Sequence, residues 1–325
     1  MTKFLGRLLS TGIALEGTRG TAEASADFWL PITACNHEDK REVVFNESAL
    51  GTIADMQSEE IVTRWAEGGF SSLIGSNSFG LILKALLGTC SSAIKETTAY
   101  THTYTLQEDS VHDALTILLK NSQQDLKFAL GMINDMTINF EKGKVLDFSV
   151  GMMSKYGESA SLTPSYAAEN IFRPQDFSLK TATTVAGLGA ASAVPVESLS
   201  VTFNKNLEMD TVLGSIDPQD ILNKNFTIEG EFTQIYDDTT YETIAYAGTN
   251  HAVRIALLNS DVTIGATSNP EFTFDLEPCA FTEVSFSRGL NDLVKQTVKF
   301  KAMYNKTNAK IIDNFTLTNT TTAYT

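Results

Sequence analysis

The feature that most restricts the fold of this chain is a β-hairpin pattern that the sequence contains twice. The first copy, Thr137 to Met152, alternates apolar with polar or small residues on both sides of a Lys-Gly turn ending at Gly143. The second copy, Val284 to Ala302, has a slightly longer turn after Gly289. Because alternation with a period of two places apolar side chains on one face, each copy predicts two antiparallel strands with one buried face.

Four further patterns precede each hairpin in the same order. The pairs are Val43–Asn46 with Val201–Asn204, Leu50–Ile53 with Leu213–Ile216, Glu67–Phe70 with Glu229–Phe232, and a helix end at Gly88-Thr89 with another at Gly248-Thr249. Each pattern alone is common in β-rich sequences and can match by chance. Together they predict a duplication: a first domain over residues 1–157, which includes an N-terminal arm, and a second over residues 196–325.

The spacing between the two copies changes along the chain. The numbering offset between Gly88 and Gly248 is 248 − 88 = 160, whereas the offset between Gly143 and Gly289 is only 289 − 143 = 146. The difference, 160 − 146 = 14, predicts additional residues in the first copy. We expect them in a protruding hairpin or loop within Ala99 to Gln124, between the helix and the hairpin.

The segments between and after the two copies differ in composition from the rest. Residues 158–195 contain Pro164, Pro174 and a run of alanine, glycine and serine residues, so a linker is expected there. Ile311 to Leu317 is a candidate for a last strand. The threonine-rich end from Thr318 is expected to fray.

Each copy also contains one short predicted helix. The first is expected to follow a cap at Asn77 or Ser78, and the second a cap at Asp238. Apolar residues recur at helical spacing in both: Phe79, Ile82, Leu83 and Leu86 in the first, and Tyr241, Ile244 and Ala245 in the second. A single apolar stripe predicts that the first helix packs on a sheet. The predicted fold class is mainly β with a few short helices, as two similar β-barrel or β-sandwich domains, each with a flanking helix.

The charge of the chain restricts its partners. The sequence has 24 basic and 39 acidic residues and a net charge of −15, which opposes adhesion to a nucleic-acid backbone. Solubility alone also explains such a charge. Gly6 and Arg7 interrupt the apolar residues near the N-terminus before they resemble a signal peptide, and no run is long enough to span a bilayer. We therefore expect a soluble protein that is made in the cytoplasm and does not enter a membrane.

The sequence contains no arrangement of residues that indicates an enzyme or a cofactor site. The four histidines, expected to be exposed, are His37, His102, His112 and His251; they show no metal-ligand spacing. The cysteines are Cys35, Cys90 and Cys279, which we expect to be reduced and packed as small hydrophobic residues. The acidic clusters are Glu38-Asp39, Glu59-Glu60 and Asp237-Asp238, which favour solvated charge or a helix cap over a calcium site. No catalytic, cofactor-binding or metal-binding residue is assigned, and no cofactor is expected.

A binding protein is the main alternative to a structural one. A duplicated β-rich module that binds carbohydrate or acts as an adhesin is expected to expose an aromatic platform. Tyr100 and Tyr104, with Trp65, are the candidates for such a platform.

The N-terminal stretch resembles a known family. Its motifs are Gly6-Arg7, Gly12 to Glu16, Thr18 to Thr21 and Phe28 to Pro31, which together resemble the opening of major tail tube proteins of long-tailed, siphovirus-like bacteriophages. The hairpin around Gly143, with Phe148 to Met152 as its second strand, also resembles paired strands that these proteins carry late in their tube domain.

The resemblance implies a structural virion protein. Tail tube subunits form six-fold rings whose inner strands join into a channel for DNA delivery, while extended arms and loops lock each ring to the next. The implied partners are other copies of the chain, the tape measure protein, the tail completion proteins and phage DNA in transit. The implied location is the virion tail, after assembly in the host cytoplasm.

Two expectations about the ring follow from the duplication. Three chains with two domains each would complete a pseudo-six-fold ring; a ring of six whole chains is the alternative. The paired strands at Thr137 to Met152 and Val284 to Ala302 are expected to line the channel. Acidic side chains are expected to face the DNA, since carboxylates repel phosphates.

Overall fold

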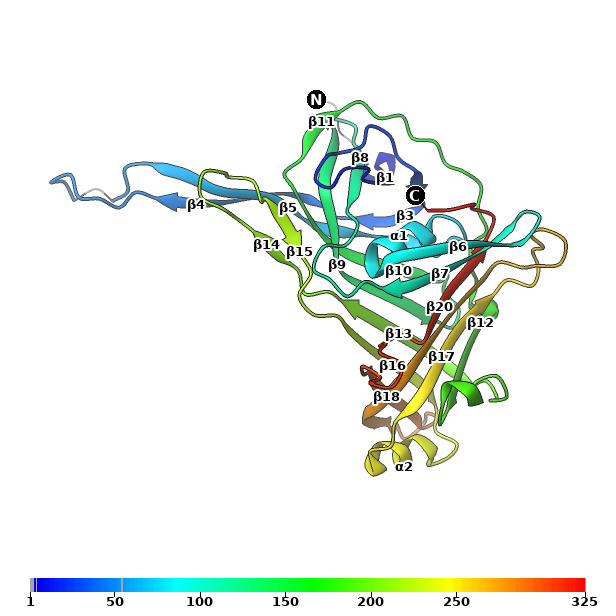
Figure 1. Cartoon of the computed structure of the whole chain (residues 1–325). Helices are drawn as coiled ribbons and strands as arrows, with labels where there is room; N and C mark the ends of the chain where they lie inside the picture. Colours follow the sequence, from blue (N-terminus) through cyan, green and yellow to red (C-terminus); the bar gives the residue numbers. More distant parts are fainter. Residues whose placement is uncertain (1–2, 4, 54, 325) are drawn as a thin grey trace.

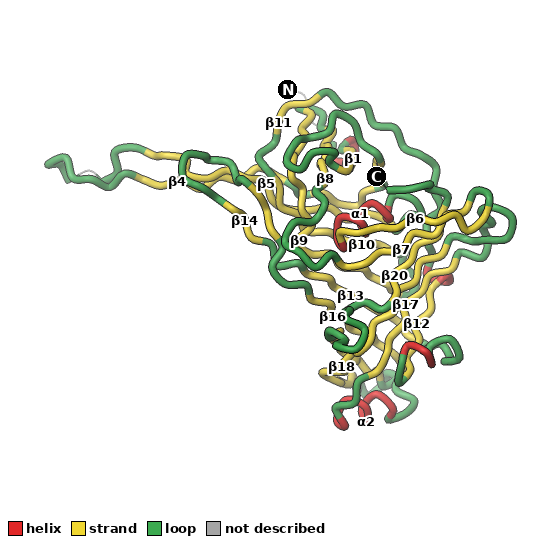
Figure 2. The backbone as a smooth tube through the Cα atoms, in the orientation of Figure 1, coloured by secondary structure: helices red, strands yellow, loops and turns green. Residues whose placement is uncertain are grey.

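A computed structural model describes residues 3, 5–53 and 55–324 of the chain. This part contains twenty strands, two α-helices and three short 3-10 helices, which confirms the mainly β prediction (Figures 1 and 2). The strand pairings among these residues close no barrel, so the barrel expectation is wrong. No helix in the described part of the chain is long and apolar enough to cross a membrane.

One long antiparallel sheet contains eight strands from both halves of the chain. Their order is β4 (Glu38–Phe45), β5 (Glu59–Leu73), β10 (Asp147–Ser154), β9 (Asp125–Glu141), β13 (Val196–Asn204), β16 (Thr227–Ile235), β19 (Lys295–Ala302) and β18 (Glu271–Ser287). A short strand, β3 (Ile32–Cys35), precedes β4 and pairs with the other end of β5. We call this arrangement the long sheet.

Both predicted hairpins are present in the long sheet. They are β9–β10 and β18–β19, and each contains a bulge at the same place relative to its partner strand. Asn134 is the extra residue in β9, beside the pair Asp135 and Gly151. Thr282 is the extra residue in β18, beside the pair Glu283 and Lys299.

The two longest of these strands also belong to a second layer. The first parts of β9 and β18 leave the long sheet and pair with strands outside it. Around β9 these are β8 (Leu115–Lys120) and β11 (Glu158–Ala160), with β1 (Ser10–Leu15) and β2 (Phe28–Leu30) beyond β8. Around β18 they are β17 (His251–Leu258) and β20 (Asn314–Asn319), with β12 (Phe177–Ala182) beyond β17, and β7 (Ala99–Leu106) and β6 (Gly88–Glu96) beyond β20. The core lies between the layers, and the aromatic rings of Phe79, Phe148 and Phe272 meet in it.

The projecting hairpin lies earlier in the chain than predicted. It consists of β6 and β7, starts directly after the first helix, and extends from the body (Figure 1). Residues 115–120, which the prediction included, form the buried strand β8 instead. Strand β6 is not predicted because its sequence, with Thr89, Ser91, Ser92 and Lys95, lacks clear apolar alternation.

Both predicted helices are present, as α1 (Phe79–Leu87) and α2 (Thr240–Ala247). All residues of α1 except Lys84 are buried, so the prediction of a single apolar stripe is wrong for this helix. The cap of α1 comes from the segment expected to be a linker. A carboxylate oxygen of Glu169 accepts hydrogen bonds from the backbone N–H groups of Asn77 and Ser78, both at 2.9 Å.

The segment at residues 158–195 is more ordered than the prediction of a linker implies. It contains β11, β12 and two 3-10 helices, η2 (Pro174–Asp176) and η3 (Val185–Gly187). Strand β12 pairs with β17 over its whole length. Proline and small residues therefore mark turns between short structured pieces in this segment.

The C-terminal end packs against α1. The Tyr324 hydroxyl donates a 2.6 Å hydrogen bond to the carbonyl of Asn77, and the Asn319 side-chain amide donates to Tyr324 at 2.7 Å. The Tyr324 ring approaches Gly80 so closely that an added Cβ would lie 2.1 Å from it. The expectation that this end frays is therefore wrong, because Tyr324 anchors it.

A long arm projects from the body and consists of β4, the first part of β5 and the tip at residues 46–58, whereas residues 66–73 of β5 pair with β10 in the body (Figure 1). Leu50 and Ile53 at the tip are largely exposed. A loop from the second half of the chain, between β14 (Glu208–Asp210) and β15 (Asp220–Leu222), runs along the base of the arm. There Arg64 binds both carboxylate oxygens of Asp217, at 2.5 and 2.9 Å.

Candidate functional site

The long sheet has one apolar and one polar face. Apolar side chains such as Ile138, Val201 and Phe232 alternate along its strands and are fully buried in the core. The intervening residues form the opposite face, which we call the polar face. Small polar residues dominate its centre: Thr137 and Asn139 on β9, Ser149 on β10, Ser200 and Thr202 on β13, and Thr233 and Thr297 on β16 and β19.

Hydrogen bonds between these short side chains join neighbouring strands. The hydroxyl groups of Thr137 and Thr202 lie 3.0 Å apart across β9 and β13, and the Ser200 hydroxyl donates to the Asn139 side-chain carbonyl at 3.2 Å. Thr233 and Thr297 repeat the contact at 3.0 Å. The polar face therefore presents short, mutually bonded groups rather than long flexible side chains.

Charges on the polar face are unequal. Carboxylates outnumber lysines; the carboxylates are Glu38, Glu67, Asp135, Glu141, Asp147, Glu229, Glu231 and Glu283, and the lysines are Lys40, Lys295, Lys299 and Lys301. Lysines in the second half have carboxylate partners: Lys301 lies 2.7 Å from Glu229, and Lys299 lies 2.8 Å from Glu283. The hydrogen bond to Glu283 raises the pKa of Lys299. The uncompensated charge of this face is therefore negative.

Two edges of the long sheet are open among the described residues. Strand β4 pairs only with β5, and residues 281–287 of β18 pair only with β19. Backbone N–H and C=O groups along such edges can pair with a strand of another chain. The long sheet can thus extend at both ends.

The histidines are more buried than predicted. His37, His102 and His112 are buried, and only His251 is partly exposed. His37 Nε2 lies 2.9 Å from the Ser154 hydroxyl, and burial lowers the pKa of His37 to about 4. His102 lies between Ser92 and Asn319, at 2.7 and 3.0 Å. These hydrogen bonds indicate that the buried histidines have a structural role in the core.

Other candidates from the sequence are dispersed. Within the described ranges, no group of three or more His, Cys, Asp or Glu residues could hold a metal ion. All three cysteines are free thiols, and Cys279 is buried. Asp238 accepts a 2.8 Å hydrogen bond from the Thr240 N–H at the start of α2, but the N-cap residue is Thr239, so the predicted cap is one residue too early.

The aromatic platform of the binding-protein alternative is not assembled. Tyr104 is buried, and its ring contacts Phe315 in the core. Trp65 lies on β5, whereas Tyr100 lies on β7, and these strands do not pair with each other. The three residues therefore do not form one exposed surface.

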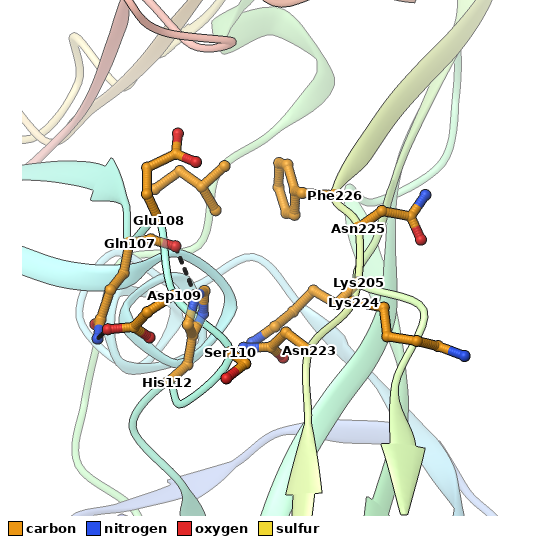
Figure 3. A pocket seen from close by; sticks show the side chains of 11 residues that line it. Gln107, Glu108, Asp109, Ser110, His112, Lys205, Asn223, Lys224, Asn225 and Phe226 are labelled. Atoms are coloured by element: carbon orange, nitrogen blue, oxygen red, sulfur yellow. Dashed lines mark hydrogen bonds between the residues drawn. The ribbon is translucent and has the colours of Figure 1, made fainter.

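A cavity of about 300 Å³ lies where the two halves meet near the end of α1 (Figure 3). Lys205, which no sequence pattern singles out, is buried beside it and donates a 3.0 Å hydrogen bond to the carbonyl of Ala85. Burial lowers the pKa of Lys205 to about 7. The Lys205 amine thus satisfies a carbonyl in the last turn of α1, which is a structural role.

Comparison with known proteins identifies the family. A family model described as phage tail tube protein matches residues 7–321, nearly the whole chain. No curated protein matches the chain. The mainly β architecture, with an open polar sheet and a projecting arm, is compatible with that match. The chain therefore belongs to the phage tail tube protein family.

Proposed function

We propose that three copies of this chain form one ring of a tail tube, that the rings stack, and that phage DNA passes through the channel they enclose. Family membership gives the chain a structural role in the tail tube and a place in the virion, and it implies self-assembly into a tube. The number of chains in a ring, the stacking of rings and the passage of DNA are our proposals.

The observation that carries the proposal is the strand order of the long sheet. The first four strands follow the order β4–β5–β10–β9, and the next four follow β13–β16–β19–β18. Each strand has its counterpart at the same place in the other set. For example, Gly68 of β5 lies opposite Met152 of β10, and in the other set Gly230 of β16 lies opposite Phe300 of β19. This order supports two copies of one domain in a single chain.

The pairing registers refine the correspondence between the copies. Cys35 lies opposite Phe70 as Leu199 lies opposite Phe232, so the counterpart of β13 begins at β3. The sequence match of Val43–Asn46 with Val201–Asn204 is therefore misplaced, since Val43 lies out on the arm. The two bulges, at Asn134 and Thr282, have an offset of 282 − 134 = 148, compared with the 146 that the turn glycines give.

The length difference between the copies then separates into two parts. Ile117 lies opposite Phe128 as Val253 lies opposite Leu276, so β8 corresponds to β17 with an offset of 253 − 117 = 136. The difference in residue number between corresponding positions falls from 160 at the helix ends to 136 at β8 and β17. The first copy therefore has 160 − 136 = 24 additional residues, in the region of β6 and β7. The same difference then rises from 136 to 148 at the bulges of β9 and β18. The second copy therefore has 148 − 136 = 12 additional residues, in the region of the β17–β18 loop.

The polar face is the proposed wall of the channel, with hairpins β9–β10 and β18–β19 at its centre. The apolar face is covered by α1 and the second layer, so the polar face is the one free to meet water and DNA. Its excess of carboxylates repels phosphates, and its short hydroxyl groups offer little for DNA to bind. DNA would therefore pass without being held.

The arm is the proposed link between rings. Its exposed apolar residues include Val44, Leu50 and Ile53, which is unusual for a surface without a partner. A neighbouring ring would cover them. The tape measure protein and tail completion proteins are the further partners proposed for the assembled tail.

Electron microscopy of negatively stained purified protein tests the proposal. We expect rings or tubes. A stable monomer that instead binds glycans on an array would contradict it and favour the carbohydrate-binding or adhesin alternative. The buried position of Tyr104 already weighs against that alternative.

A further inference from the structure

We propose that neighbouring chains in a ring meet through a copy of the contact that joins the two halves of one chain. In this contact, β18 of one chain pairs with the edge formed by β3 and β4 of a second copy, where β3 and β4 follow each other along β5. The pairing is the same as that of β9 with β13 within each chain. The inference rests on the proposed ring and adds which residues of neighbouring chains face each other. We call the contact the inter-chain junction.

The internal junction supplies the template. Strands β9 and β13 pair over seven residues, from Glu141 opposite Ser198 to Asp135 opposite Asn204. The bulges at Asn134 and Thr282 relate β9 to β18 by an offset of 148 in residue number. The pairing with β5 and β16 relates Cys35 of β3 to Leu199 of β13 by an offset of 199 − 35 = 164.

These two offsets fix the register of the inter-chain junction. Asp135 corresponds to Glu283, and Asn204 corresponds to Lys40, so Glu283 of one chain lies opposite Lys40 of its neighbour. By the same rule Ser287 lies opposite Asn36 of the neighbour. The edge of β18 from residue 281 onward and the edge of β4 are accessible, because they pair with no other strand in the described part of the chain. Asn36 lies between β3 and β4 and is held in line with them by hydrogen bonds to Gly69 of β5.

Charge complementarity supports this register. Glu283 already contacts Lys299 at 2.8 Å on its own chain, and Lys40 contacts Glu38 at 2.5 Å on its own chain. In the proposed register, Glu283 faces Lys40 across the junction, Lys299 lies opposite Glu283 on β19, and Glu38 lies two residues before Lys40 on its own strand, so each lysine has a carboxylate neighbour on its own chain and across the junction Glu283 meets the oppositely charged Lys40. Opposite charges on directly facing residues stabilise a strand pair, whereas like charges destabilise it.

A second part of the internal junction also has an unused counterpart. Helix η2 precedes β12 and lies over the turn of the β9–β10 hairpin, where the Phe177 ring is 4.8 Å from that of Phe140. Pro174 and Leu146 line one cavity there. The packing shows that η2 and the start of β12 cover the turn of the first hairpin.

The corresponding piece of the first copy is η1 (Gly6–Leu8), which precedes β1 as η2 precedes β12, at an offset of 174 − 6 = 168. Leu5 and Leu8 beside it are 70% and 62% exposed. The turn of the β18–β19 hairpin has exposed apolar residues as well, with Leu290 fully exposed and Leu293 68% exposed. In the inter-chain junction, residues 5–9 of one chain cover this turn of its neighbour, which buries both apolar groups.

Disulfide cross-linking of assembled protein tests the register. A chain with Asn36→Cys and Ser287→Cys, in a Cys35→Ser background, is expected to form covalent dimers and trimers on oxidation. The matched control combines Ser287→Cys with Glu42→Cys. Position 42 lies six residues after position 36, roughly 20 Å away along an extended chain, so this control is expected to remain uncross-linked. Each variant that carries only one of the two introduced cysteines, with Cys90 and Cys279 still present, should stop at a dimer or stay monomeric on denaturing gels.

The outcomes separate this inference from the ring itself. Rings or tubes in which the 36–287 pair fails to cross-link, or the 42–287 pair cross-links instead, would overturn the register and leave the ring in place. Absence of rings from the unsubstituted protein would overturn both proposals.

A second experiment tests the proposed contact of residues 5–9 with the β18–β19 turn. Leu8→Ser should raise the concentration needed for assembly about tenfold, whereas Ile94→Ser, on exposed β6, should not. Equal effects of the two substitutions would refute the role of residues 5–9.

Discussion

At the scale of single residues, buried polar groups join segments that are distant in sequence. Glu169 caps α1 through Ser78, 91 positions away, and Tyr324 secures the C-terminal end on the same helix. His37 contacts Ser154 across the sheet and packs edge-on against the Phe128 ring at 4.8 Å. These contacts share one property: a polar side chain is kept inside by a specific partner.

His37 should make the protein sensitive to acid. Its pKa is about 4 in the folded chain, below the ordinary 6.5, so the unfolded chain binds more protons between these values. The stability that neutral His37 contributes is complete above pH 6.5 and is lost as the pH falls toward 4. The loss amounts to at most about 3 kcal/mol.

Urea unfolding of the wild type and of His37→Gln at pH 7, 5.5 and 4 checks this expectation. The glutamine variant retains a hydrogen-bonding side chain but cannot titrate, so it should lose less stability on acidification. His102 and His112, whose pKa values burial also lowers, are present in both proteins and cancel. Parallel curves for the two proteins would show that His37 is not the cause.

Residues of the candidate site are only partly predictable from the sequence. The threonines and serines of the polar face are evident there, because their alternation with apolar residues is regular. The burial of His102 and Lys205 is not, since each depends on a partner far along the chain: Asn319 for His102 and Ala85 for Lys205. The polarity of the neighbouring residues in the sequence therefore does not predict burial that depends on such a distant partner.

At the scale of elements, local patterns predict best where one face is apolar and the other polar. Both hairpins and both helices are confirmed. Strand β6 is not evident in the sequence, because its place in the fold comes from pairing with β7 and not from its own composition. The burial of α1 on all sides is not evident either, since the C-terminal residues that cover it lie more than 200 positions away.

The arm is the element with the most direct test. Replacing its tip, residues 47–57, by a two-residue Asn-Gly turn should leave single rings intact and prevent their stacking, because the apolar contacts with the next ring are lost. A matched control shortens the 211–216 loop, which belongs to the second half of the chain and lies beside the arm. Sedimentation and negative-stain images of both variants distinguish rings from tubes.

Full-length tubes from the tip variant would contradict the proposed link between rings. Loss of the rings themselves would indicate that the arm acts within a ring. Circular dichroism of the tip variant checks that its β content is otherwise retained.

At the scale of the whole molecule, the proposed copies share a sheet. The duplication in the sequence predicts separate barrels or sandwiches joined by a linker. In the structure, β9 of the first half pairs with β13 of the second, so the long sheet runs through both halves without a break. Strand pairing over such distances leaves no local periodicity, so the fold class was predictable while the shared sheet was not.

A shared sheet with open ends would allow one chain to serve as two sectors of the proposed ring. In the proposed ring, each chain would contribute the eight strands of its long sheet, and the internal junction would replace one of the contacts that single-domain subunits make between chains. Three such chains need only three inter-chain junctions. Closing the sheet satisfies the two open edges, which otherwise favour uncontrolled association.

The symmetry and lining of assembled tubes test this account most directly. A cryo-electron microscopy reconstruction is expected to show three chains in each ring, with the polar face of every long sheet turned to the lumen and carboxylates in excess along it. Six whole chains in a ring, the polar face on the outer surface, or a lumen dominated by lysine and arginine would contradict it.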